Sequence, residues 1–206
     1  METKQHWESI YTTKGEKRVS WFQEHALTSL GIIARTAASN SARIIDVGGG
    51  ASTLVDDLLG KGYRELTVLD VSAEALRAAK LRLGGNSDQV NWIEADITEV
   101  VLPERHFDVW HDRAVFHFLT DPRARHKYVE AVLHSLKPGG HVIVATFGPN
   151  GPLQCSGLPI VRYSPESLHH EFGGQFLLIE HKEEAHVTPT GAVQQFIYCY
   201  CRKQDG

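Results

Sequence analysis

The chain has 206 residues, a formal net charge of −4, and 42% hydrophobic against 22% charged residues. This balance is typical of a globular protein with a substantial core, and it argues against disorder. With acids and bases interspersed, we expect neither a nucleic-acid nor a membrane partner. No apolar run approaches the roughly 20 residues that span a bilayer. The N-terminus lacks the apolar part of a secretory signal, and three cysteines, an odd number, favour reduced thiols in the cytoplasm.

The first part of the chain, residues 5–40, is predicted to be helical with interruptions. A polar, glycine-containing break (TTKGEKRVS, 12–20) separates an aromatic first segment from the helix-like stretch 20–38. Four aromatic residues surround this break. They either close over a bound ligand, where their faces would favour a cation, or form the core of an N-terminal helical layer. These residues are Trp7, Tyr11, Trp21 and Phe22.

After residue 40, short apolar runs alternate with helical stretches, which implies βαβ units and a parallel sheet. Ser72 is the expected N-cap of one helix, and LKPGG at 136–140 is expected to turn the chain into the fifth strand. Strands are predicted over 43–47, 65–69, 90–94, 107–111 and 141–147, and helices over 52–60, 72–83, 112–119 and 123–136.

The C-terminal third has a different pattern. Residues 147–168 form a long irregular stretch, and such loops tend to carry function. We expect Cys155, Arg162 and Tyr163 to wall a substrate pocket there, and Ser164 to start a helix. Two extended runs joined by TPTG then predict an antiparallel pair at the end of the sheet.

Three glycines follow the first predicted strand in IIDVGGGAST, residues 44–53. In an open α/β sheet, ligands bind beyond the carboxyl ends of the strands, and residues without Cβ atoms allow a close approach. No Lys-Ser/Thr pair follows, so this turn is not a phosphate-binding P-loop. A dinucleotide fingerprint would require glycine or alanine where Thr53 stands. The spacing of Asp46, Gly48 and Gly50 fits acid-x-Gly-x-Gly better.

Two further acids lie at the ends of the next strands. Asp70 can accept both hydroxyls of a ribose, and Asp96 can accept from an adenine amine while Ile97 offers apolar contact. Each acid alone could instead cap the following helix. Three of them at successive strand ends indicate a nucleoside ligand and not a polyphosphate.

Taken in order, IIDVGGGAST, VLDVS, EADIT, FDVWHDRAVFHFL, LKPGGHVIVATF and the terminal hairpin resemble the class I S-adenosylmethionine-dependent methyltransferases over roughly residues 40–200. The resemblance implies an α/β, Rossmann-like sandwich with a seven-stranded, mostly parallel sheet and an antiparallel C-terminal hairpin. It also implies S-adenosyl-L-methionine as the cofactor, with Gly48 and Gly50 near its methionine part. The cofactor contacts we predict are Trp7, Tyr11, Trp21, Asp46, Gly48, Gly49, Gly50, Asp70, Val71, Asp96, Ile97 and His111.

Two segments are similar to narrower groups. Residues 112–129 (DRAVFHFLTDPRARHKYV) resemble thiopurine- and tellurite-type methyltransferases. Residues 6–22 (HWESIYTTKGEKRVSWF) are similar to the tryptophan-rich lid of those enzymes and to the start of some lysine methyltransferases. The sequence does not choose between the two.

The predicted catalytic residues follow the fourth strand. They are His111, Asp112, Arg113 and His117. A sulfonium already activates its methyl group, so in-line transfer depends mainly on positioning. A thiol acceptor needs only partial deprotonation, whereas an oxygen or ammonium acceptor needs a base, and a histidine is suited to that. Asp112 and Arg113 could instead form an ion pair that fixes the loop. Phe22, Cys155 and Arg162 are the predicted substrate-binding residues.

We expect one methyltransferase domain over residues 1–206, with a helical lid (1–40), a cofactor-binding core (41–147), and a substrate loop with the hairpin (148–206). The favoured acceptor is a small molecule, possibly a thiol or another soft nucleophile. The alternatives are a protein lysine, a nucleoside-binding module without turnover and, less favoured, a nicotinamide dehydrogenase. No metal is expected, because Cys199 and Cys201 lack the spacing of zinc ligands. The sequence indicates no oligomeric state.

Overall fold

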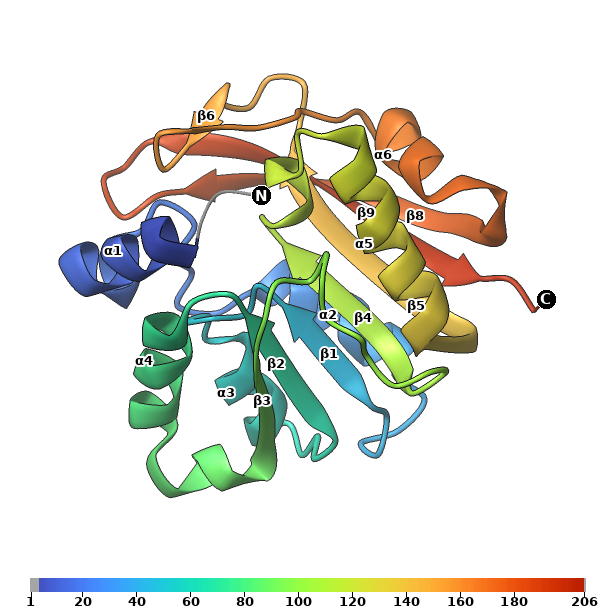
Figure 1. Cartoon of the computed structure of the whole chain (residues 1–206), viewed down its shortest axis with the longest axis horizontal. Helices are drawn as coiled ribbons and strands as arrows, with labels where there is room; N and C mark the ends of the chain where they lie inside the picture. The colour runs from blue at the N-terminus through green and yellow to red at the C-terminus, as the bar shows by residue number, and fades with distance from the viewer. Residues whose placement is uncertain (1–3, 206) are drawn as a thin grey trace.

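The computed structural model describes residues 4–205 and is built on a seven-stranded sheet of order β3-β2-β1-β4-β5-β9-β8 (Figure 1). The first five strands of this order are parallel, and β9 runs antiparallel to both of its neighbours, β5 and β8. The predicted Rossmann-like fold with its C-terminal hairpin is confirmed. The strands are β1 Ile44–Val47, β2 Leu66–Asp70, β3 Val90–Glu94, β4 Phe107–Arg113, β5 Leu136–Phe147, β8 Phe176–Val187 and β9 Val193–Lys203. A separate small hairpin pairs β6 Gln154–Cys155 with β7 Leu158–Pro159.

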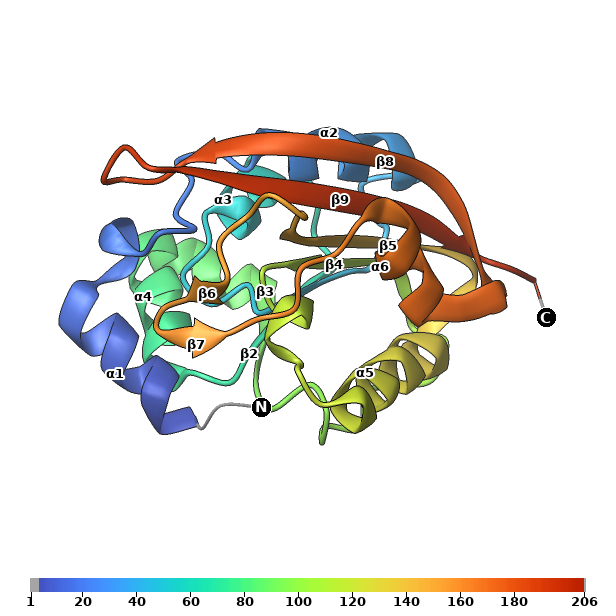
Figure 2. The same cartoon turned by 90° about the horizontal axis from the view of Figure 1, so that it is seen from above.

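Helices cover both faces of the sheet (Figure 2). Because successive strand residues point to opposite faces, Ile44 packs with α2, α3 and α4 while its neighbour Ile45 packs with α5 and α6. The helices are α1 Lys4–Lys14, α2 Leu27–Thr36, α3 Leu54–Gly60, α4 Ala73–Leu83, α5 Pro122–Ser135 and α6 Pro165–Phe172. Short 3₁₀ turns are η1 Glu16–Arg18, η2 Gly84–Gln89, η3 Phe116–Phe118 and η4 Gly173–Gln175.

Side-chain caps set the starts of several helices. The Ser72 hydroxyl accepts from the backbone N–H of Ala75 at the start of α4, and Asp121 caps α5 in the same way. Ser164 forms a reciprocal capping box with Ser167 at the start of α6. The predicted helix starts at Ser72 and Ser164 are therefore confirmed.

Three predicted elements differ from the structure by more than two residues. The helix expected over 112–119 does not form, because β4 continues through Arg113 and only η3 follows. Asp112 accepts from the backbone N–H groups of Val115 and Phe116, and Ala114 lies in the left-handed region at φ 74°, so the chain makes a tight turn there. The helix expected to start at residue 20 starts at Leu27, and β5 starts at Leu136 instead of residue 141.

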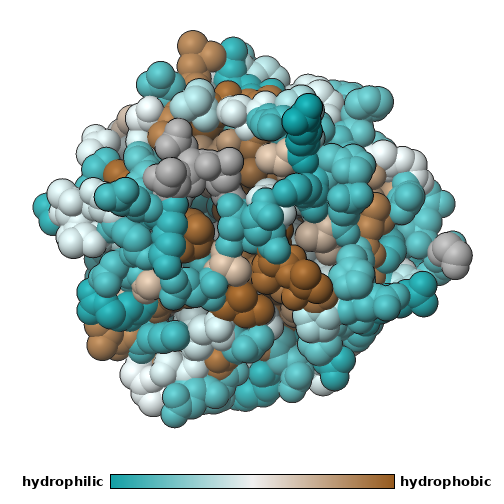
Figure 3. Space-filling view, in the orientation of Figure 1, coloured by the Kyte–Doolittle hydropathy of each residue, from teal (hydrophilic) through white to brown (hydrophobic). Residues whose placement is uncertain are grey.

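The face seen in Figure 1 is mainly hydrophilic, with hydrophobic residues gathered near its centre (Figure 3). Large exposed apolar side chains include Leu27 and Val101, and single ones of this kind are ordinary on protein surfaces. Within residues 4–205, no helix has the length and apolar character needed to cross a membrane.

Candidate active site

A cleft opens at the carboxyl ends of β1, β2 and β4, under the N-terminal segment, which we define as residues 4–26. It consists of two adjoining pockets of about 620 and 540 Å³ that are partly open to solvent. Both pockets are lined by Tyr11, Trp21, Gly48 and Arg113, so they form one continuous site. The predicted ligand site and the predicted aromatic residues therefore lie together.

The glycine turn leaves no room for side chains. A Cβ on Gly48 would lie 1.9 Å from Val115 Cγ2, and one on Gly50 would lie 2.5 Å from Asp70 Oδ2. Both glycines have positive φ, at 69° and 30°, which side chains disfavour. A Cβ on Gly49 would lie 2.5 Å from Asp46 Oδ2. The bare backbone is packed against the two carboxylates, and this forms a cradle at the floor of the cleft.

Asp70 is buried at the end of β2 and lines the cleft. Its Oδ1 accepts from the backbone N–H of Ser72 at 2.8 Å. Burial, with added repulsion from Asp46 and Glu8, raises the pKa of Asp70 to about 7. A buried carboxyl group that lines a cleft and has a raised pKa is typical of a ligand-binding site.

Asp46 is joined to a buried histidine. Its Oδ1 lies 2.7 Å from His111 Nδ1, and His111 Nε2 lies 2.8 Å from the Ser29 hydroxyl. Both ring nitrogens are thus engaged, so His111 fixes the orientation of Asp46. Sequence reasoning missed Ser29, since it lies on α2, 82 residues away along the chain.

Comparison with known proteins agrees with this geometry. Residues 44–140 match the family described as "Methyltransferase domain". In overall structure, the chain is similar to a S-adenosylmethionine-dependent methyltransferase from Methanosarcina mazei, with a TM-score of 0.71 and 18% identity, over 84% of this chain and 98% of that one. Residues 44–140 therefore match a methyltransferase domain, and the chain has the fold of a S-adenosylmethionine-dependent methyltransferase. S-adenosylmethionine is the cofactor that the sequence predicts for a chain of this fold.

The curated relatives of this chain carry names with different methyl acceptors. An "eEF1A lysine and N-terminal methyltransferase homolog" of Drosophila melanogaster is 25% identical over 145 residues, which are 67% of this chain and 21% of the relative. A "Ubiquinone biosynthesis O-methyltransferase" of Citrobacter koseri is 30% identical over 124 residues, which are 59% of this chain and 50% of the relative. The chain thus spans between a fifth and a half of the length of these relatives.

Of the other predicted cofactor contacts, some line the cleft and one does not. Val71 and Ile97 line the first pocket, together with Ala95, which the sequence reasoning missed. Asp96 is not among the lining residues, and its Oδ1 accepts from both the backbone N–H and the hydroxyl of Thr98 at 2.8 Å. Asp96 thus stabilises a turn, and it caps no helix because β3 is followed directly by β4.

The N-terminal segment is fastened over the cleft at its aromatic side chains and at Glu8. Trp7 packs edge-on against Trp21 and Phe118, at centroid distances of 5.8 and 5.0 Å. Glu8 accepts from the backbone N–H groups of Ala73 and Glu74 and from the Ser72 hydroxyl, so it caps α4. Burial acts to raise the pKa of Glu8, but the amide hydrogen bonds outweigh it and hold that pKa below its ordinary value. Sequence reasoning missed Glu8, whose partners are over 60 residues away.

Arg113 lines both pockets but is held by protein groups. It donates to the Trp21 carbonyl at 2.9 Å, to Glu184 at 3.2 Å and to the Tyr198 hydroxyl at 3.1 Å. Its guanidinium also lies 4.2 Å above the Phe196 ring centroid. No ion pair joins it to Asp112 within residues 4–205. Arg113 thus fastens the end of the N-terminal segment to the hairpin.

Asp112 and His117, two predicted catalytic residues, lie outside the lining of both pockets. Asp112 is fully buried and also accepts from the Tyr128 hydroxyl at 2.7 Å, and burial raises its pKa to about 6. His117 is buried against Phe118 and Phe147. Burial, followed by the charge of Arg113, lowers the pKa of His117 to about 3, so this ring stays neutral.

Of the three predicted substrate residues, Phe22 lines the second pocket. Cys155 is buried on β6, where burial raises its pKa to about 11, and Arg162 donates to the Gly151 carbonyl at 3.2 Å. Neither is among the lining residues. Cys155, Cys199 and Cys201 are all unpaired and buried. Within the part of the chain that the structure describes, no group of three His, Cys, Asp or Glu residues is arranged to hold a metal ion.

Proposed function

We propose that this chain transfers the methyl group of S-adenosylmethionine to a soft nucleophile, a thiol or selenol, of a small molecule. The observation that carries the proposal is that the titratable side chains lining the described cleft, other than Asp70, are already bound by protein groups or held neutral. Asp70 is assigned to the cofactor in this proposal. S-adenosylmethionine supplies a methyl group that its sulfonium already activates. The chain therefore has to hold the two reactants and keep water out, and an acceptor that arrives nucleophilic needs no base.

The residues present fit the cofactor. Asp70 lines the first pocket and accepts the two ribose hydroxyls in this proposal, beside the apolar side chains of Val71 and Ile97. Gly48 lines both pockets and Gly49 lines the second, so the backbone of this turn is the proposed contact of the methionine part. The second oxygen of Asp96 is the proposed acceptor for the adenine amine.

The engaged groups of the cleft argue against a general base. Both nitrogens of His111 are occupied, and Glu16 is paired with Arg82 at 2.5 Å. Burial and the charge of Asp70 raise the pKa of Tyr11 far above neutrality. A free thiol has a pKa of about 8.5, so a useful fraction is thiolate near neutral pH. An alcohol or an ammonium group would need a proton acceptor.

A protein lysine is the second candidate. It is favoured by the similarity to the Drosophila melanogaster relative, whose name includes lysine methylation and which matches 67% of this chain. A lysine would have to reach the cleft under α1, which is capped onto α4 by Glu8, and would arrive protonated. The small soft acceptor needs neither an opening for a peptide nor a base.

The cytoplasmic location and the division of the chain at residues 40 and 147 remain predictions from the sequence.

The experiment that tests the proposal is a transfer assay with radiolabelled methyl donor and a panel of small thiols, selenite, phenols and lysine peptides. We expect label in the thiols or the selenite, and much less label at low donor concentration with Asp70→Asn, the control with reduced affinity for the cofactor. Label in lysine peptides alone would instead support the second candidate. Binding of S-adenosylhomocysteine without any transfer would indicate a nucleoside-binding module.

A further inference from the structure

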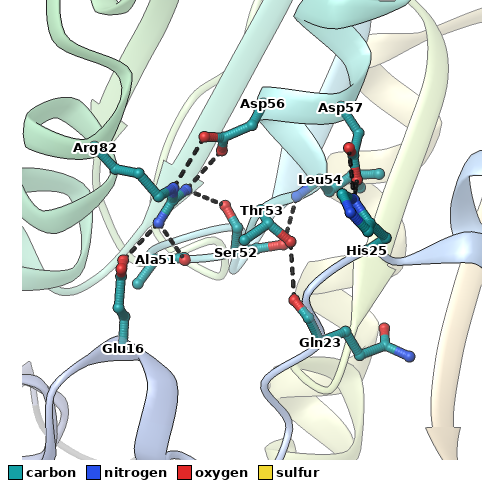
Figure 4. A network of polar contacts seen from close by, with 10 residues as sticks. All are labelled: Glu16, Gln23, His25, Ala51, Ser52, Thr53, Leu54, Asp56, Asp57 and Arg82. Atoms are coloured by element: carbon teal, nitrogen blue, oxygen red, sulfur yellow. Dashed lines mark hydrogen bonds and ion pairs between the residues drawn. The ribbon is translucent and has the colours of Figure 1, made fainter.

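Arg82, near the end of α4, reaches the glycine turn and the N-terminal segment at once (Figure 4). Its Nη1 donates to the Ala51 carbonyl at 2.9 Å, and its Nη2 donates to the Ser52 carbonyl at 2.7 Å. These two carbonyls come directly after Gly50. Arg82 therefore fixes the direction of the backbone that leaves the cradle.

The same guanidinium holds two carboxylates. Its Nε and Nη2 donate to Asp56 of α3 at 3.0 and 2.7 Å, and its Nη1 donates to Glu16 of η1 at 2.5 Å. The five N–H donors of an arginine are thus matched by five acceptors. Lysine has three donors on one atom and cannot reproduce this fork.

Glu16 and the turn residues belong to the same wall of the cleft. Glu16, Ala51 and Ser52 all line the second pocket, and the side chains of Arg82 and Glu16 are only 20% and 22% exposed. The N-terminal segment is also anchored at the other end of α4, where Glu8 caps the helix. A ligand that orders the turn should therefore also order the segment, since both are bound to one rigid helix.

We propose that Arg82 is a positioning residue that couples closure of the N-terminal segment to cofactor binding at the glycine turn. The proposal rests on the proposed function for the identity of the ligand. Coupling of this kind is reciprocal: whatever the closed segment adds to cofactor affinity, the cofactor adds to the stability of the closed segment. Arg82 acts through Ala51, Ser52 and Glu16 and is not among the residues that line the pockets.

The test measures two quantities, the affinity for S-adenosylhomocysteine by calorimetry and the hydrogen–deuterium exchange of residues 4–22 with and without this ligand. In the unmodified chain, we expect the ligand to slow exchange in these residues. Glu16→Ala should bind S-adenosylhomocysteine with an affinity within about threefold of the unmodified chain, because Arg82 still holds the turn through the Ala51 and Ser52 carbonyls. This variant should lose the slowing of exchange. Arg82→Gln should bind about tenfold more weakly or worse and also lose the slowing, an effect ordinary for coupled sites.

Two further variants separate the hydrogen bonds of Arg82 from general effects of charge and folding. Arg82→Lys keeps the charge and should restore only part of the affinity. Arg77→Gln is the matched control, because Arg77 lies on the same helix, is exposed, and pairs with Glu74 of that helix. It should behave as the unmodified chain. Should Arg82→Gln fail to fold, as judged by circular dichroism, Glu16→Ala and Arg82→Lys decide the matter.

The outcomes distinguish the two proposals. The coupling would be overturned by full slowing of exchange in Glu16→Ala, or by an Arg82→Lys affinity for S-adenosylhomocysteine equal to that of the unmodified chain. The proposed cofactor site would not be affected by either result. An unmodified chain that binds no S-adenosylhomocysteine would overturn the proposed function and the coupling with it.

Discussion

Replacing Asp70 by asparagine should make the ligand-free chain more stable and its cofactor binding weaker. Asp70 is 7% exposed and its pKa is about 7, against an ordinary 3.8, because burial disfavours its charge. A raised pKa means that ionisation destabilises the fold: stability falls as the pH rises from about 4 to 7 and then stays level. At 1.36 kcal/mol per unit, the penalty above pH 7 is at most about 4 kcal/mol. Asparagine removes it, and its Oδ1 can still accept from Ser72.

The same change should reduce the affinity for S-adenosylhomocysteine. Hydrogen bonds to a charged group contribute about 1.5–3 kcal/mol each, and 1.4 kcal/mol is a factor of ten in affinity. With weaker acceptance at two ribose hydroxyls, we expect a loss of about 10- to 100-fold. The assays are calorimetry at pH 8 and thermal unfolding at pH 4 and 8, with the exposed Asp88→Asn as matched control. Unchanged affinity, or an Asp70→Asn chain that is less stable than the unmodified one at pH 8, would refute the reasoning.

Three further predictions concern the neighbouring residues. Deleting residues 1–22 should lower the rate of methyl transfer much more than the calorimetric affinity for S-adenosylhomocysteine; an unaffected rate would remove the covering role of this segment. Asp112→Ala should lower the free energy of unfolding by about 1–3 kcal/mol in denaturant titrations at pH 4, where Asp112 is uncharged in the fold, because it leaves the Tyr128 hydroxyl and two N–H groups without an acceptor; unchanged stability at this pH would contradict this. His117→Leu should keep the transfer rate and be more stable in acid. The pKa of His117 is about 3 in the folded state against 6.5 in the unfolded state, so this histidine costs stability as the pH falls from 6.5 to 3, about 2 kcal/mol at pH 5. A lost rate at pH 8 in a folded variant would show that this ring takes part in the reaction.

Much of the fold could be predicted because local patterns agree with tertiary structure. The apolar runs at 90–94 and 107–111 became strands, and the terminal runs became β8 and β9, because each pattern is imposed by sheet packing. The predicted helix over 112–119 failed for the opposite reason. Its composition suits a helix, but the Asp112 carboxylate binds the N–H groups of Val115 and Phe116 and stops the chain in a turn. Side chain to backbone bonds of this kind override propensity.

The candidate site was predicted in part. Asp46, Gly48, Gly49 and Asp70, which the sequence predicts as cofactor contacts, line the cleft because strand ends of a parallel sheet converge at one edge. Glu8, Ser29 and Arg82 were missed, although each is bound at the cleft or its cover. The partners of these side chains lie 26 or more residues away along the chain, so no local spacing reveals them. Only the folded structure shows which of these polar side chains contact each other.

The most direct test of the account is a crystal structure of the chain with S-adenosylhomocysteine. We expect the nucleoside in the cleft, with both ribose hydroxyls within hydrogen-bonding distance of Asp70 and the homocysteine part along Gly48 and Gly50. Ligand bound elsewhere, or bound in the cleft with Asp70 contacting only Ser72, would contradict the central claim.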